Sequence, residues 1–330
     1  MPGSRESMRT KCYYCDCQAI ARVRYAKLSL CKSHLVEFVE SRVEKAVRRY
    51  NMVKRGDKVV VAVSGGKDSV ALLYIADSLA KRMEFDYIVL HIDLGIGEYS
   101  EKSRVTVEKH CRSLGADCII IDLRRDLGFT LPDLISRLKT RRACSLCGAV
   151  KRYIMNATAL GIKASSVATA HHADDMLVYL FKNFITQDYE ALGKLSPVNR
   201  SIDDIVATKI KPMYEVYEKD IASYVVARGL EFTDAKCPFE NMRGLELSIR
   251  RFLEEIEDKM PGMKIAILRR FAETSSQLRL WERRADISRC ESCGLISRGA
   301  ECTFCKVTRR AYGQPMGPLV REVIKSKYVW

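Results

Sequence analysis

A strand-like apolar run is followed at once by a loop whose residue types suit phosphate binding. The run KVVVAVS covers residues 58–64, and an apolar helical pattern begins near Val70. The loop between them consists of Ser64, Gly65, Gly66, Lys67, Asp68 and Ser69. Two glycines let backbone N–H groups turn toward an anion, the helix N-terminus adds partial positive charge, and the lysine and the serine hydroxyls complete the shell. The spacing differs from that of a Walker A loop.

Eight residues near the two ends of the chain have the spacing of tetrahedral zinc ligands. At one end a C-x-x-C pair is followed by C-x-x-H, and at the other end two C-x-x-C pairs follow one another. The two sets are Cys12, Cys15, Cys31 and His34, and Cys290, Cys293, Cys302 and Cys305. Each set fills all four positions of a structural zinc ion, so we expect two structural Zn²⁺. Cys17 lies close to the first pair, and we interpret it as a spare thiol.

Three further cysteines form an incomplete ligand set in the middle of the chain. Cys144 and Cys147 make a C-x-x-C pair with no second pair nearby, and Cys237 stands alone. Three thiolates can hold a 4Fe-4S cluster by three corners and leave the fourth iron open for a ligand such as sulfide. We favour this over a persulfide carrier at Cys144 or Cys237, activated by neighbouring lysines and arginines, and over buried thiols without chemistry.

The composition indicates a globular protein that meets nucleic acid. The 330 residues are 47% hydrophobic and 29% charged, which excludes a disordered or fibrous chain. Lysine and arginine outnumber the acidic residues 56 to 41, and a net charge of +15 suits contact with phosphates. No apolar run is long enough for a membrane helix or a signal peptide. We therefore expect a cytoplasmic protein with no membrane contact, whose 13 cysteines serve metal or thiol chemistry.

The elements that would position these residues alternate between strand and helix patterns. Strands are predicted at 58–64, 87–93, 118–123 and 165–172. Their alternation with helical stretches predicts an α/β fold with a parallel sheet. Residues 35–54 predict an amphipathic helix that joins the first zinc module to the sheet. We also predict a late strand at 230–235 and helices within 244–284.

Three domains follow from this order of patterns. Residues 1–40 would form an N-terminal zinc-binding module, and residues 41–285 the catalytic α/β domain. Residues 286–330 would form a C-terminal zinc ribbon and tail. Neither a repeat nor a low-complexity linker marks the boundaries near residues 40 and 285, so they are set to within several residues.

The SGGKDS loop after a first strand resembles the PP-loop of the ATP pyrophosphatase superfamily. Members of that superfamily have a Rossmann-like, adenine nucleotide α-hydrolase-like sheet, and they cleave ATP to AMP and pyrophosphate while adenylating a substrate oxygen. The segments LHIDLGIGEYSEKS from Leu90 and ATAHHADD at 168–175 are similar to further superfamily motifs. The resemblance implies an ATP site made by Ala62, Ser64, Gly65, Gly66, Lys67, Asp68, Ser69, His91, Ile92, Lys151, Ala170 and Asp175.

The second of these motifs ends in a pair of carboxylates, Asp174 and Asp175. They would bind magnesium or orient the acceptor group, and the alternative is a pair that caps a helix N-terminus. The superfamily pattern is A-T-G-H-N-x-D-D, from which this chain departs at Ala170 and His172. It departs again at Met176, where an acid is usual.

Longer segments resemble the two-zinc-ribbon tRNA 2-thiouridine synthetases of the TtuA type. KTRR, CSLCG and KRYIMN within residues 139–156, and KPMYEVYEKDIASYVVARGLEF from Lys211, carry this resemblance, which extends from the first zinc set to the last. It implies that Cys144, Cys147 and Cys237 hold the 4Fe-4S cluster. It also implies a homodimer and a catalytic set of Lys67, Asp68, Lys151 and Asp175.

The resemblance implies ATP-dependent thiolation of tRNA. With Mg²⁺ and ATP as co-substrate, the uridine C2 oxygen would be adenylated and then replaced by sulfur. We expect uridine 54 of the T-loop, with wobble uridine 34 and a non-sulfur adenylating enzyme as alternatives. The sulfur donor is open between sulfide, a persulfide and a ubiquitin-like thiocarboxylate protein. A zinc protein that binds nucleic acid without catalysis is disfavoured by the intact Lys67, Asp68 and Asp175.

Overall fold

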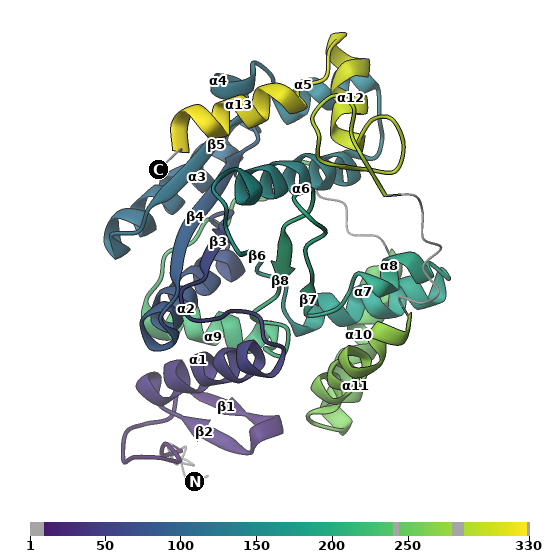
Figure 1. The fold of residues 1–330 in the computed structure, drawn as a ribbon. Coiled ribbons are helices and arrows are strands. Elements are labelled where there is room, and N and C mark those ends of the chain that lie inside the picture. Colours follow the sequence, from purple (N-terminus) through teal and green to yellow (C-terminus); the bar gives the residue numbers. More distant parts are fainter. Residues whose placement is uncertain (1–9, 240–243, 279–286, 329–330) are drawn as a thin grey trace, which may run out of the picture.

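The centre of the molecule is a six-stranded sheet with the strand order β5-β4-β3-β6-β8-β7 (Figure 1). The structure is a computed structural model and describes residues 10–239, 244–278 and 287–328. The strands are β5 Cys118–Asp122, β4 Asp86–Asp93, β3 Lys58–Ala62, β6 Ser166–Ala168, β8 Thr208–Ile210 and β7 Val198–Asn199. Five of them are parallel, and β7 pairs antiparallel with β8. The predicted α/β fold is therefore confirmed.

Helices cover both faces of the sheet, and each face has its own apolar core. The first core includes residues of α1 Lys32–Arg49, α2 Lys67–Met83, α3 Gly97–Leu114 and α9 Glu218–Arg228. The second includes residues of α4 Leu123–Leu127, α5 Leu131–Leu138, α6 Ala143–Gly161, α12 Thr303–Tyr312 and α13 Gly317–Tyr328. Because side chains alternate along a strand, Val59 and Val61 enter the first core and Val60 enters the second. This burial on both faces explains the continuous apolar runs in the sequence.

A third apolar core lies beside the carboxyl edge of the sheet. It joins α7 Ala173–Ile185 to α10 Gly244–Lys259 and α11 Met263–Leu278, and α8 Tyr189–Gly193 lies next to it. Ile249 and Leu253 of α10 and Leu268 of α11 are buried in this core. The packing brings α10 and α11 to the N-terminal end of α7, where the paired carboxylates lie. Among the described residues no helix is long and apolar enough to span a bilayer.

Small modules stand at both ends of the chain. The N-terminal module pairs β1 Ala21–Val23 with β2 Leu28–Leu30 around the short 3-10 helix η1 Arg24–Ala26. The C-terminal module pairs β9 Ser288–Arg289 with β10 Ile296–Ser297 and continues into α12. Its Phe304 stacks on Tyr153 of α6 with ring centroids 4.1 Å apart, and the Tyr153 hydroxyl donates to the Gly317 carbonyl at 3.0 Å. The C-terminal module therefore shares a core with the sheet.

The predicted strand at 230–235 is wrong. This segment joins no sheet, because its backbone bonds to other partners. The Thr233 N–H donates to the Gly65 carbonyl at 2.9 Å, and the Glu231 carbonyl accepts from His110 Nε2 at 2.7 Å. The edge of the sheet is instead occupied by β7, which pairs with β8, and neither of these two strands was predicted.

The other predicted elements are present with shifted ends. The four predicted strands correspond to β3, β4, β5 and β6, and the helix expected at 35–54 is α1. It begins earlier because Cys31 takes the N-cap position. The helices expected within 244–284 are α10 and α11, and residues 279–284 lie outside the described residues. The three domain ranges stay a prediction.

The stacked Phe304 should be a major link between the C-terminal module and the sheet. Its side chain is fully buried, whereas that of Phe184 on α7 is 65% exposed. We predict that Phe304→Ala lowers the free energy of unfolding by about 3–5 kcal/mol because it leaves a cavity. The matched control Phe184→Ala should change it by about 0.5 kcal/mol or less. Urea unfolding followed by circular dichroism measures both, and equal effects would contradict the prediction.

Candidate functional site

The loop of residues 64–69, here called the phosphate loop, connects the end of β3 to the start of α2. Gly66 is the N-cap of α2, and Ser69 stabilises the turn by accepting from the Ser64 N–H at 3.1 Å and donating to the Gly66 carbonyl at 2.9 Å. Gly65 has φ +87°, and a Cβ there would lie 2.8 Å from the Ser103 carbonyl oxygen. Only glycine fits this position without strain. The loop thereby presents a helix N-terminus to the carboxyl edge of the sheet, where anions bind favourably.

A pocket lies directly beside this loop. Its empty space is about 510 Å³, a volume that includes open solvent at its mouth. Its lining includes five residues that the resemblance assigned to ATP: Ala62, Ser64, His91, Ile92 and Lys151. Leu90, Leu94, Tyr99, Ser103 and Met155 are further lining residues that the sequence analysis did not assign. The pocket is apolar with a few polar groups, as a site for a planar base requires.

His91 offers one polar atom to this pocket. Its Nδ1–H donates to the Val63 carbonyl at 2.9 Å, so Nε2 is left as an acceptor. Nε2 is buried and has no hydrogen-bond partner among the described residues. Burial lowers the pKa of His91, so the ring is neutral near pH 7. A ligand with an N–H or O–H group would satisfy this atom.

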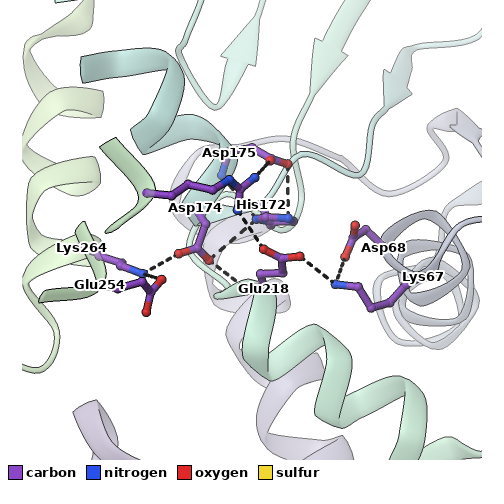
Figure 2. A network of polar contacts seen from close by, with 9 residues as sticks. Lys67, Asp68, His172, Asp174, Asp175, Glu218, Glu254 and Lys264 are labelled. Atoms are coloured by element: carbon purple, nitrogen blue, oxygen red, sulfur yellow. Dashed lines mark hydrogen bonds and ion pairs between the residues drawn. The ribbon is translucent and has the colours of Figure 1, made fainter. Parts of the chain in front are cut away.

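The two carboxylates at the start of α7 have different surroundings, which Figure 2 shows. Asp174 is buried, and its Oδ1 accepts from Lys264 Nζ at 2.7 Å while its Oδ2 accepts from the Glu218 N–H at 2.7 Å. Burial would raise the pKa of Asp174, but Lys264 and the Glu218 N–H hold it below its ordinary value. Both oxygens of Asp174 therefore hold other parts of the protein in place. Asp175 is the carboxylate of the pair on which Asp68 of the phosphate loop acts.

Asp175 lies opposite the loop with its carboxylate only partly exposed. His172 is the N-cap of α7, its Nδ1 accepts from the Asp175 N–H at 3.4 Å, and its Nε2 lies 3.3 Å from Asp175 Oδ2. This explains how histidine replaces the usual asparagine at the position. Burial raises the pKa of Asp175, and the nearby Asp68 adds to the rise while His172 and Arg250 oppose it. Met176, another of the three departures, is buried in the third core.

Glu218 and Arg250 complete the site, although the sequence analysis assigned neither. Lys67 Nζ lies 2.8 Å from Asp68 Oδ1 and 3.3 Å from Glu218 Oε1. Arg250 Nη1 donates to Glu218 Oε2 at 3.0 Å, and Arg250 Nη2 donates to Asp175 Oδ1 at 3.2 Å. Glu218 lies in the KPMYEVYEKD segment, whose family resemblance could have pointed to it. No spacing in the sequence links Arg250 to the phosphate loop.

Both terminal ligand sets come together. In each set the four ligand atoms lie within 4.8 Å of one another. Cys31 and Cys302 are the N-caps of α1 and α12, so each helix start fixes one ligand. The donor sets, three sulfurs with one imidazole nitrogen and four sulfurs, suit tetrahedral zinc. Cys17 is exposed and belongs to neither set.

The central cysteines approach one another without closing around a single point. Cys144, Cys147 and Cys237 are not among the groups of described residues whose ligand atoms fall within 4.8 Å. Burial raises the pKa of Cys147, Lys151 opposes the rise, and Cys237 and Cys144 add to it, so these groups face Cys147. Cys144 is exposed and donates to the Phe239 carbonyl at 3.3 Å. Among the described residues the three thiols therefore do not form a group as compact as either terminal set, which a single tetrahedral zinc ion would require.

The chain is similar to known proteins along most of its length. Residues 36–238 match the PP-loop domain family. The tRNA-5-methyluridine(54) 2-sulfurtransferase of Pyrococcus horikoshii is 35% identical over 298 residues, which cover 90% of this chain and 93% of that protein. The protein of the same name from Thermus thermophilus is 36% identical over 303 residues, covering 91% and 92%.

A solved structure has the same fold. The U34-tRNA thiolase NcsA from Methanococcus maripaludis, with its [4Fe-4S] cluster, superposes with a TM-score of 0.76. The match covers 93% of this chain and 97% of that one at 22% sequence identity. At this identity the likeness establishes the shared arrangement of elements.

The positive φ of Gly65 and its contact with Ser103 lead to a stability prediction. Gly65→Ala should lower the free energy of unfolding by about 1–3 kcal/mol because a Cβ strains the backbone and meets a carbonyl. In Gly66→Ala the nearest atom would be Ser64 Oγ at 3.8 Å, an ordinary contact, so this matched control should lose about 1 kcal/mol or less. Thermal unfolding of the two variants tests this, and an equal loss would contradict it.

Proposed function

This chain belongs to the PP-loop domain family, and from that premise we propose that it is an ATP-dependent tRNA uridine 2-sulfurtransferase. Relatives with 35% and 36% identity over about nine tenths of their own length are named for uridine 54 of tRNA, and we propose the same position here. The net charge of +15 suits a tRNA substrate.

The observation that carries this proposal is the place of Lys151. It lines the nucleotide pocket beside the phosphate loop, and its charge also acts on Cys147. One lysine of α6 thus connects a site for ATP with a set of three thiols. A PP-loop enzyme that adenylates without sulfur chemistry would have no need for that arrangement, so the thiols favour thiolation over the alternative.

Adenylation turns a poor leaving group into a good one. The C2 oxygen of uridine would attack the α-phosphorus of ATP and release pyrophosphate, and sulfur would then displace AMP from C2. Lys67 and Lys151 would stabilise negative charge that develops on phosphate oxygens. The backbone N–H groups at the start of α2 would orient the phosphates, and the apolar pocket would hold the planar base of ATP.

Two groups would assist these residues when bound. A magnesium ion would be held by Asp68 and Asp175, whose carboxylate oxygens suit it, and would neutralise phosphate charge. A 4Fe-4S cluster on Cys144, Cys147 and Cys237 would supply an open iron site for sulfide.

The partners of the protein are part of the proposal. The terminal modules and the basic surface would hold tRNA by its shape and its phosphates and present one unstacked base. The sulfur donor would be sulfide, a persulfide or a ubiquitin-like thiocarboxylate protein, and the protein would act as a homodimer in the cytoplasm. A reducing compartment would keep the 13 cysteines available.

The proposed function predicts a thiolated nucleoside in a defined place. After anaerobic incubation of unmodified tRNA with the protein, ATP and sulfide, mass spectrometry of nuclease fragments should find 2-thiouridine chemistry at position 54. Thiolation at position 34 would contradict the proposed position, and AMP formation without any thiolation would favour the non-sulfur alternative.

If a cluster supplies the sulfur, tRNA thiolation should require each of the three central cysteines. Cys237→Ser should bleach the absorption of the anaerobically reconstituted protein and reduce thiolation at least about 100-fold, since two thiolates hold a cluster poorly. Cys17→Ser, which changes an exposed thiol outside every set, should leave both unchanged. Thiolation by Cys237→Ser without iron would instead support a persulfide carrier at Cys144.

The terminal sets should contain two zinc ions per chain. We predict that Cys305→Ser reduces the zinc content from two to about one, because a structural site needs all four ligands. The buried Cys111 belongs to neither set, so Cys111→Ser should keep two zinc ions. Mass spectrometric metal analysis measures the ratio, and fewer than about one zinc in the unaltered protein would refute both sites.

A further inference from the structure

Glu218 shares its carboxylate between two cations that come from different helices. Lys67 at the start of α2 contacts Oε1, and Arg250 of α10 contacts Oε2. The other terminal nitrogen of Arg250, Nη2, contacts Asp175, and Lys67 also contacts Asp68. Three carboxylates and two cations therefore form one continuous chain of ion pairs from the phosphate loop to α7 (Figure 2 shows its Lys67 to Glu218 part).

Phosphate binding requires a change in this chain. Lys67 is the cation of the loop, and here two carboxylates hold its ammonium group. Once Lys67 turns to a phosphate, Glu218 loses one of its two counter-ions while its side chain is only 43% exposed. A carboxylate with this exposure keeps part of its hydration, yet it still attracts the ammonium group beside it, so Glu218 without another partner would compete with the phosphate for Lys67.

We propose that Arg250 is a positioning residue for nucleotide binding, which neutralises Glu218 so that Lys67 can leave it and bind the phosphates of ATP. The inference rests on the ATP-binding part of the proposed function. In the nucleotide-bound protein Lys67 pairs with phosphate and Arg250 pairs with Glu218. Asp175, which shares Arg250 in this structure, then becomes available to the cation that accompanies ATP.

The shape and the anchoring of Arg250 suit this role. A guanidinium group has five N–H donors on three nitrogens in one plane, and two of these nitrogens can serve two carboxylates at once, which the single ammonium of lysine does less well. Ile249 and Leu253 are buried in the third core and fix this stretch of α10. The neighbouring Arg251 is exposed, so the same helix offers a matched cation outside the site.

The test measures binding of a non-hydrolysable ATP analogue with Mg²⁺ by isothermal titration calorimetry. Arg250→Gln should weaken binding about tenfold, the factor that ~1.4 kcal/mol makes in a dissociation constant, whereas Arg251→Gln should bind like the unaltered protein. In the double variant Glu218→Gln with Arg250→Gln, the competing carboxylate is gone. Binding should then return to within about twofold of the original value, a non-additive result that residues acting as a unit produce.

A purely structural role of Arg250 predicts another pattern. If Arg250 only held α10 in place, removing Glu218 as well would not restore binding, and a double variant as weak as Arg250→Gln would overturn the proposal. Unchanged binding by Arg250→Gln, or an equal loss in Arg251→Gln, would also overturn it. Normal analogue binding without tRNA thiolation would refute the proposed function alone, and no binding by the unaltered protein would refute both.

Discussion

The buried ion pair between Asp174 and Lys264 constrains the whole site. Both side chains are less than a tenth exposed, and their nearest atoms are 2.7 Å apart. Removing one partner of such a pair leaves an uncompensated charge and costs about 3–5 kcal/mol, so α11 must stay docked against α7. Glu254 also contacts Lys264, which ties α10 to the same point. The positions of Asp175 and Arg250 depend on this docking.

Features that are local in the chain could be predicted from the sequence. The phosphate loop, the two terminal ligand sets and the strands β3 to β6 each depend on neighbouring residues, and Gly65 takes the turn conformation for which its type was singled out. Cysteine spacing was informative because a knuckle fixes two ligands within four residues. The structure also separates the paired carboxylates, since Lys264 engages Asp174 whereas Arg250 engages Asp175.

The remaining features depend on contacts between distant segments. Arg250 lies 75 positions beyond Asp175, and no periodicity encodes their contact. The segment 230–235 has a strand-like composition, yet its backbone bonds to the phosphate loop and to His110 of α3. Contacts with distant residues therefore override the local preference of this segment for a β-strand. The short strand β7 was missed for a related reason, because a two-residue strand is defined by its partner.

The hydrogen bond between Thr233 and Gly65 connects the phosphate loop to the segment that leads to Cys237. Thr233 lies four residues before Cys237, and its N–H is held 2.9 Å from the carbonyl oxygen of the phosphate loop. If Gly65 changed its conformation around a nucleotide, it would either break this hydrogen bond or move the segment from Thr233 to Cys237, which carries the third central thiol. In the proposed reaction, a nucleotide that moved Gly65 would therefore also act on the segment that carries Cys237, so the phosphate loop and the third central thiol would respond together.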